Sequence, residues 1–338
     1  MADSELKNVK TENAVWRIIK RIFDIQEVNT ILPVLVLIII AIIFNPMFLN
    51  PGNLVVIGQR MSMWGLIAIG EGLIILTGNF DISVGAMVAF DCVFFAVAAA
   101  KWHLPMAVAI LLAILLPVTL STISGLIVVK LKINSFLATI AMLFICRGMS
   151  KMMTNARPVP IAPAQGSELF LKFGQATPLK LSWTFFIFIA LIIISQVVLK
   201  KTAYGRKLYA TGDNNNVARL AGISPDNVKL STFIISGFLV GLASILLIGK
   251  EAVANANFGT GWELQAIAAV AIGGISLIGG AGSMIGVLIG VIMMQIMANI
   301  LILLQINLNM QSVVLGVIMI LATILDLKRR NRILGKID

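Results

Sequence analysis

The chain has 338 residues, of which 59% are hydrophobic and 12% are charged, and its mean hydropathy is +1.00. Because soluble domains carry about a quarter charged residues, this composition excludes an ordinary soluble protein and indicates a membrane protein. The formal net charge of +11 need not mean nucleic-acid binding, since the location of the basic residues decides their role. Cys92 and Cys146 lie inside apolar runs, which argues against a disulfide framework.

Apolar runs predict an all-α polytopic membrane protein. A spanning helix needs about 20 mostly apolar residues, and about ten runs qualify as candidates. They are residues 31–48, 54–77, 82–100, 105–129, 134–153, 183–199, 229–249, 263–279, 283–304 and 310–327. The second and third runs, like the eighth and ninth, are separated only by glycine-rich breaks. Residues 1–29 form an N-terminal segment with an amphipathic helix at 15–29, residues 30–327 the transmembrane domain, and residues 328–338 a basic tail.

The distribution of basic residues predicts the orientation. An even number of spans places both tails, Lys130, Lys132 and the 201–228 loop on one side, and most of the basic residues lie there. The positive-inside rule makes this side cytoplasmic. The main external segment is then 154–182, which is too polar and too rich in proline to span and is expected to pack over the external mouth.

The first break has the sequence Gly78-Asn79-Phe80-Asp81-Ile82-Ser83-Val84-Gly85. In one interpretation, glycine ends one helix and Asp81 caps the next. In the other, a helix broken at membrane depth exposes backbone groups and lines a pathway. The two interpretations are compatible and both stay open.

The second break, residues 273–283, is richer in glycine and contains no lysine, so it is not a phosphate-binding loop. Gly282, Gly286 and Gly290 are spaced by four, which favours close helix packing over substrate contact. An offset of 202 residues aligns the two breaks, for example Gly78 with Gly280, and suggests a parallel internal repeat. Chance alignment of apolar sequence is the alternative. The glycines expected to pack helices or form the gate are Gly78, Gly85, Gly273, Gly274, Gly279, Gly280, Gly282, Gly286 and Gly290.

Polar side chains inside the runs are candidates for a substrate path, because charges within a membrane rarely face lipid. Each has an ordinary structural alternative: a carboxylate paired inside the bundle, an amide that joins two helices, or an acidic residue that favours a helix N-terminus. For Gln295 and Asn299, four residues apart on one helix face, the joining role is slightly favoured. The candidates are Glu71, Asn79, Asp81, Asp91, Trp262, Glu263, Gln265, Gln295 and Asn299.

The polar stretch 212–223, Gly-Asp-Asn-Asn-Asn-Val-Ala-Arg-Leu-Ala-Gly-Ile, is predicted to be partly helical and cytoplasmic. Together with the segments 78–85 and 262–286, it resembles the permease subunits of bacterial ABC importers of the ribose type. That family carries monosaccharides and, in one branch, the autoinducer-2 signal. Asn79, Phe80 and Trp262 depart from the usual family pattern, so the resemblance does not identify the solute.

The resemblance implies a bacterial inner-membrane protein that works as a homodimer or beside a closely related permease. An external or periplasmic binding protein would deliver the sugar, and cytoplasmic ATP-binding subunits would dock at the loop. ATP and magnesium would be bound by those subunits, with no cofactor, metal or catalytic residue in this chain. The residues expected to serve ATPase coupling are Gly212, Asp213, Ala218, Arg219 and Gly222.

The leading prediction is thus a permease, not an enzyme, that imports a monosaccharide of the pentose or hexose class. The rival is an ion-coupled secondary carrier of a small polar solute that uses Glu71 or Asp91. The 201–228 loop argues against the rival, because a carrier has no evident use for it. A membrane enzyme would need a nucleophile–base pair or a metal-ligand set, and the single histidine, His103, supplies neither.

Overall fold

The computed structural model describes residues 26–162, 164–178 and 181–307, together with 310, 313–314, 316–317 and 320. The predicted helix at 15–29, the predicted last span at 310–327 and the basic tail at 328–338 lie wholly or largely outside the described residues. Within the described part, the regular secondary structure is helical except for one short sheet, in which β1 (Val159–Pro160) pairs antiparallel with β2 (Val253–Ala254).

The helices follow the predicted runs closely. In chain order they are α2 (Gln26–Phe44), η1 (Pro46–Leu49), α3 (Pro51–Leu76), α4 (Val84–Ala100), α5 (Met106–Lys130), α6 (Ser135–Thr154), α7 (Ser167–Gln175), α8 (Trp183–Lys201), α9 (Ala203–Asp213), α10 (Asn215–Leu220), α11 (Pro225–Glu251), α12 (Trp262–Ile272) and α13 (Met284–Leu303). The predicted run 31–48 extends too far, because α2 stops at Phe44 and η1 follows after Asn45. The predicted run 263–279 is also wrong at its end. The helix stops at Ile272 because Gly273 and Gly274 follow, and Gly274 has a φ of +84°, which a continuing helix cannot use.

Five described helices, α5, α6, α8, α11 and α13, are long and apolar enough to cross a membrane. Helices α4, α12 and the stretch Val34–Phe44 of α2 are apolar but shorter. The 26 residues of α3 are long enough but include Arg60 and Glu71, and α3 is not among the five. The described part of the chain is therefore almost entirely helical, and the chain is a polytopic membrane protein; the count of ten spans and the internal repeat remain predictions.

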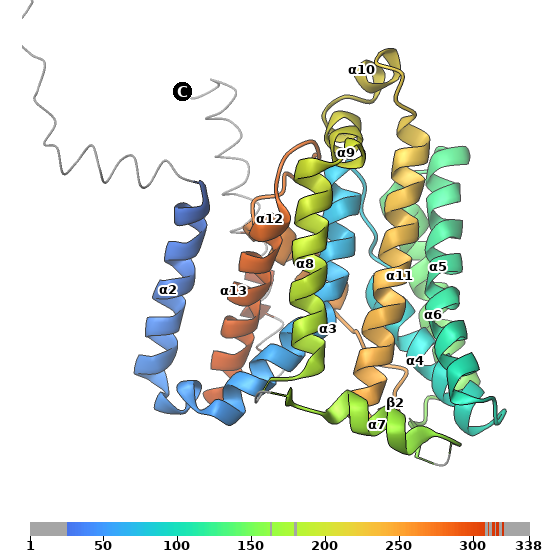
Figure 1. Ribbon diagram of the computed structural model, residues 1–338, viewed down its shortest axis with the longest axis vertical. Helices are drawn as coiled ribbons and strands as arrows, with labels where there is room; N and C mark the ends of the chain where they lie inside the picture. Colours follow the sequence, from blue (N-terminus) through green and yellow to red (C-terminus); the bar gives the residue numbers. More distant parts are fainter. Residues whose placement is uncertain are drawn as a thin grey trace, which may run out of the picture.

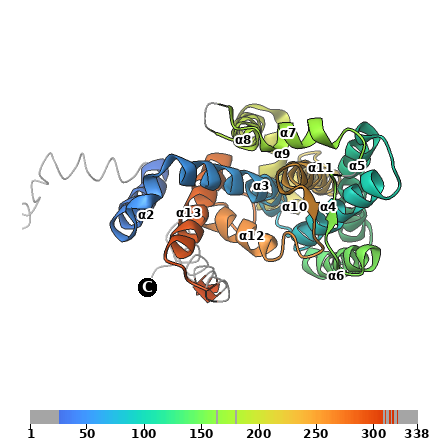
Figure 2. The same cartoon turned by 90° about the horizontal axis from the view of Figure 1, so that it is seen from below.

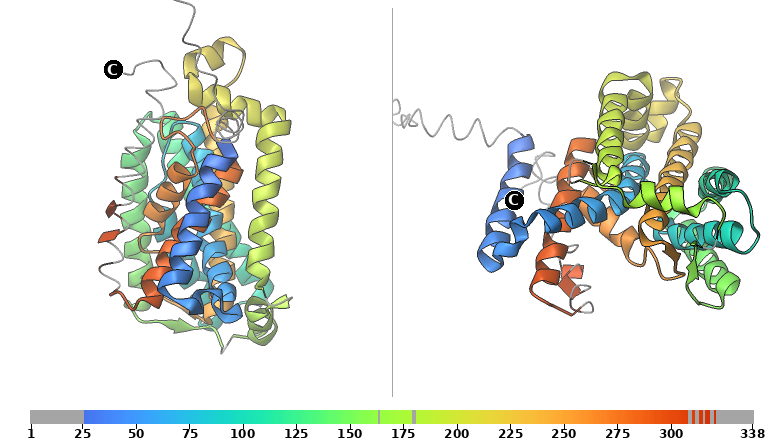
Figure 3. Two further views of the ribbon diagram at one scale, coloured as in Figure 1. Left: turned by 90° about the vertical axis from the view of Figure 1, so that its left-hand side faces the viewer. Right: turned by 60° about the horizontal axis from the view of Figure 1, so that its bottom comes forward.

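The helices form a bundle whose two ends differ. Helices α9 and α10 lie at one end, and α7 and β2 lie at the other (Figure 1). Seen along the bundle, α3 and α11 lie in the middle, with α2 and α13 on one side and α5 and α6 on the other (Figure 2). Two further views confirm that α2 and α13, blue and red, lie side by side (Figure 3). In this arrangement α3 is surrounded by protein.

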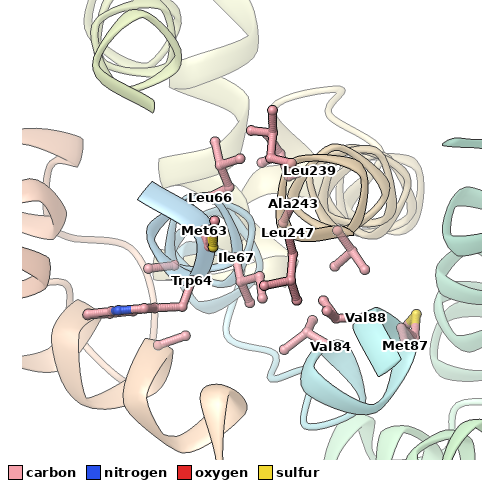
Figure 4. Packing of buried hydrophobic residues seen from close by; sticks show 14 of the residues in the cluster. Met63, Trp64, Leu66, Ile67, Val84, Met87, Val88, Leu239, Ala243 and Leu247 are labelled. Atoms are coloured by element: carbon pink, nitrogen blue, oxygen red, sulfur yellow. The ribbon is translucent and has the colours of Figure 1, made fainter. Parts of the chain in front are cut away.

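The burial of its residues shows that α3 is the central helix of the bundle. From Gly58 to Leu76 every residue of α3 except Arg60 is buried, on all faces of the helix, as expected for a helix without a polar face. Its Leu66 lies beside Leu239 of α11, and its Ile67 lies toward Leu247 of α11 and Val84 and Val88 at the start of α4 (Figure 4). This packing fixes the C-terminal end of α3, where the first break begins.

Candidate functional site

The first break is an extended connection held by α6. After Leu76 the chain turns at Gly78, whose φ is +76°, and α4 begins only at Val84. Backbone N–H groups inside a membrane need protein partners. Two hydroxyls of α6 supply them: Ser135 Oγ accepts from Phe80 N and Thr139 Oγ1 accepts from Ile82 N, each at 3.1 Å. The interruption between α3 and α4 is therefore an ordered connection held in place by α6.

Three of the predicted path residues meet at this break. Glu71 Oε1 accepts a hydrogen bond from Asp81 N at 3.1 Å, and the amide of Asn79 donates to Thr77 O at 3.1 Å. Asp81 does not cap α4 as one interpretation expected. Ser83 occupies the N-cap position, and Asp81 Oδ1 instead accepts from the backbone N–H of Ser83 at 2.9 Å and from its hydroxyl. These buried side chains hold the backbone of the break.

The start of α12 meets the start of α4. Gly85 and Gly259 are in backbone contact so close that a Cβ on either would overlap the carbonyl oxygen of the other. The carboxylate of Glu263 lies against Gly85, and the charge of Arg147 of α6 is near it without forming a direct ion pair. Arg147 also donates from Nη1 to the carbonyl oxygens of Ala256 and Phe258, at 3.1 and 2.7 Å, in the loop that precedes α12. The other two α12 candidates, Trp262 and Gln265, are both partly buried.

The remaining path candidates lie elsewhere. Asp91 is wholly buried in α4 and faces Ser244 of α11. Gln295 Oε1 accepts from Trp64 Nε1 at 3.1 Å, and Asn299 exchanges two amide hydrogen bonds with Asn53, at 3.0 and 2.8 Å. Gln295 and Asn299 thus join α13 to α3. In the described part of the chain, no group of three or more His, Cys, Asp or Glu residues is arranged to hold a metal ion.

The second break folds back on itself and touches the first. Ser276 N donates to Ala281 O at 2.9 Å, and Gly280 N donates to Leu76 O at 3.0 Å. Gly279 and Gly282 have φ values of +104° and +138°, which L side chains rarely adopt. Beyond the break, Gly286 and Gly290 of α13 pack so tightly on Gly273 and on Ala269 of α12, respectively, that a Cβ would overlap the carbonyl oxygen there.

The polar 212–223 stretch contains the end of α9 and all of α10. Asn214 Oδ1 caps α10 by accepting from Asn216 N at 2.9 Å, and α10 ends at a turn in which Gly222 has a φ of +76°. Arg219 lies in α10 as expected for a short helix, 3.4 Å from Asp226 of α11. Asp213 is instead the last residue of α9.

The apolar side chains of α10 divide into two kinds. Ala218 is buried, whereas Val217 and Leu220 are 59% and 89% exposed. Helix α10, which ends at Leu220, lies at the tip of the bundle, on the same end as α9 (Figure 1).

Two residues that the sequence did not single out bind the second break. Gln196 Oε1 of α8 accepts from Met284 N, and the Tyr209 hydroxyl of α9 donates to Gly282 O, each at 2.8 Å. Burial raises the pKa of the Tyr209 phenol, so it remains a proton donor at neutral pH. Neither residue carries a sequence signal for this role, because both partners are backbone atoms far along the chain.

Comparisons with known proteins identify the family. The family model described as "branched-chain amino acid transport system / permease component" matches residues 53–323. The ribose import permease protein RbsC of Escherichia coli K12 is 34% identical over 308 residues, which cover 90% of this chain and 95% of the relative. The RbsC of Bacillus subtilis is 35% identical over 314 residues, covering 92% and 96%.

More distant relatives have related names. The L-arabinose ABC transporter permease protein AraH of Azospirillum brasilense is 27% identical over 330 residues, covering 98% of this chain and 94% of the relative. The autoinducer 2 import system permease protein LsrC of Escherichia coli O9:H4 is 29% identical over 311 residues, covering 91% and 89%. No solved structure matches the chain significantly. The chain therefore belongs to the family of transport-system permease components, and it is a membrane permease related to those of sugar ABC importers.

Proposed function

We propose that the chain is the permease subunit of an ABC importer that moves a monosaccharide of the pentose or hexose class into the bacterial cytoplasm. The names of the relatives, which include ribose and arabinose permeases, support a sugar rather than the amino acids in the family's description. Their identity of 27–35% over at least nine-tenths of this chain leaves the individual sugar open.

The observation that carries the proposal is the exposed apolar tip of α10. Val217 and Leu220 are exposed on a short, capped helix at the bundle end that the basic residues mark as cytoplasmic. An exposed apolar pair on an ordered helix suits a protein partner. A pair of separate ATP-binding subunits, which would also bind ATP and magnesium, fits this position.

The rest of the assembly follows from the same proposal. Two copies of this chain, or this chain with a closely related permease, would enclose the path, and an external binding protein would deliver the sugar at the end that carries α7. Both termini would be cytoplasmic. Glu71, Asn79 and Asp81 would shape the first break, whereas Gln295 and Asn299 would hold α13 to α3.

Reconstituted uptake tests the proposal. Wild-type chain is placed in proteoliposomes with candidate ATP-binding subunits and binding protein, and uptake of labelled ribose, arabinose and a hexose is measured with and without ATP. Leu220→Glu puts a charge at the proposed contact, and Leu131→Glu, at a 66% exposed leucine in the α5–α6 connection, is the matched control.

The expected outcome is uptake that requires ATP and the ATP-binding subunits, is lost in Leu220→Glu and is retained in Leu131→Glu. Arg219→Glu, which replaces attraction to Asp226 by repulsion, should also reduce uptake. Uptake by the chain alone, driven by an ion gradient, would contradict the proposal and favour a secondary carrier.

A further inference from the structure

Three segments far apart in the sequence meet at the carbonyl group of Leu76. Gly280 N, in the second break, donates to Leu76 O at 3.0 Å. Gly212 of α9 lies so close that a Cβ there would overlap both Leu76 O and Gly280 N. A Cβ on Gly279 would lie 2.9 Å from Gly78 N. The end of α3, the second break and the end of α9 therefore touch backbone to backbone, with no side chain between them.

Helices α8 and α9 hold the second break at further points. Tyr209 binds Gly282 O and Gln196 binds Met284 N, each at 2.8 Å, so both anchor the chain where α13 begins. A Cβ on Gly280 would lie 2.9 Å from Asp213 N. The second half of the break, from Gly279 to the start of α13, is thus held by the two helices that lead to α10.

The connection between the contacts on the second break and α10 is short. Asn214 alone separates α9 from α10, and it caps α10 with its side chain. A displacement of α10 must therefore move the C-terminal end of α9. Because packed protein interiors transmit strain and do not compress, that movement is passed on to Leu76 and Gly280 directly, and so to both breaks.

We propose that Tyr209, Gln196 and Gly212 are positioning residues that couple movement of α10 to the two helix breaks. At this junction, a force that displaces α10 would shift the conformation of both breaks together. This is the behaviour expected of a two-state element whose equilibrium is biased from a distant site. The inference rests on the proposed function, since the work is supplied by the partner ATPase. The inference names the residues through which movement of α10 reaches the helix breaks of the permease.

The chain contains a matched pair for the test. Tyr204 and Tyr209 lie on the same helix, and each uses its hydroxyl in one hydrogen bond. Tyr209 binds the second break, whereas Tyr204 is bonded to the hydroxyl of Ser231 in α11 at 2.7 Å. Replacing either tyrosine by phenylalanine removes one hydroxyl and keeps the ring. Only Tyr209→Phe removes a contact with the break.

The readout is the number of ATP molecules hydrolysed per sugar taken up in proteoliposomes that contain the ATP-binding subunits and binding protein. A lost hydrogen bond shifts a two-state equilibrium by about fivefold. Tyr209→Phe is expected to raise the ratio by a factor of that order, and Tyr204→Phe is expected to leave it unchanged. Gln196→Met, which removes the acceptor for Met284 N at nearly constant size, should raise the ratio as Tyr209→Phe does.

Thermal unfolding in detergent checks that the two phenylalanine variants are equally stable. An unchanged ratio in both Tyr209→Phe and Gln196→Met would overturn the inference, as would an equal rise in Tyr204→Phe. In either case ATP-dependent uptake by the wild type would still support the proposed function. Absence of ATP-dependent uptake by the wild type would instead overturn the proposed function, and the inference with it.

Discussion

Replacing Glu71 by glutamine and by leucine separates a structural role of this carboxylate from a role in ion coupling. Glu71 is wholly buried in α3, and its Oε1 accepts the hydrogen bond of Asp81 N at 3.1 Å. Glutamine keeps an acceptor oxygen at this position, whereas leucine leaves the N–H of Asp81 without its partner. A buried donor left unpaired costs about 1–3 kcal/mol. We therefore expect Glu71→Leu to lower the free energy of unfolding by about 1–3 kcal/mol.

We expect Glu71→Gln to unfold within about 1 kcal/mol of the wild type, since the hydrogen bond is retained. Unfolding is followed by circular dichroism as sodium dodecyl sulfate is added to detergent-solubilised protein, and ATP-driven uptake is measured in parallel. Glu71→Gln should retain uptake, because the residue acts on the backbone of the break. A Glu71→Gln variant that is as stable as the wild type but has lost all uptake would refute this reasoning and favour a carrier coupled through Glu71.

Three further experiments, which use four substitutions, test the packing around the site. Asn53→Ala and Asn299→Ala are combined in a double-mutant cycle of unfolding free energies. The coupling free energy should be about 1 kcal/mol, because the pair shares two hydrogen bonds and interhelical hydrogen bonds in membranes average about 0.6 kcal/mol each. Additive single effects would contradict the pairing. Arg147→Met should speed hydrogen exchange in the β2–α12 loop, because two of its carbonyl oxygens lose the hydrogen bonds that they accept from Arg147 Nη1. Unchanged exchange by mass spectrometry would count against this role. Gly85→Val should abolish the folded state in detergent, because the side chain overlaps Gly259; a normally folded variant would show that the two helix starts separate easily.

The helices were predictable from the sequence because a membrane demands long apolar runs. Runs such as 105–129 and 183–199 differ by one or two residues from α5 and α8. The prediction failed at the end of α12, where Leu277 and Ile278 made the run look continuous although Gly273 and Gly274 had already ended the helix. Hydropathy alone gives no information on that choice, whereas the positive φ of Gly274 decides it.

The site was predictable only in part. The two breaks and the α10 stretch were located from glycine and polar residues in otherwise apolar sequence, and the shared face of Gln295 and Asn299 followed from their spacing of four. Their partners did not follow, because Trp64 and Asn53 belong to another helix. Contacts between backbone atoms, such as Gly280 N with Leu76 O, leave no trace in residue type beyond the glycine itself.

ATP-dependent sugar uptake tests the central claim most directly. Proteoliposomes that contain the chain, its binding protein and the candidate ATP-binding subunits should accumulate labelled sugar only when ATP is present, and Leu220→Glu on the exposed tip of α10 should abolish that uptake. Accumulation that proceeds without ATP or the ATP-binding subunits, follows a proton or sodium gradient and is unaffected by Leu220→Glu would contradict the account.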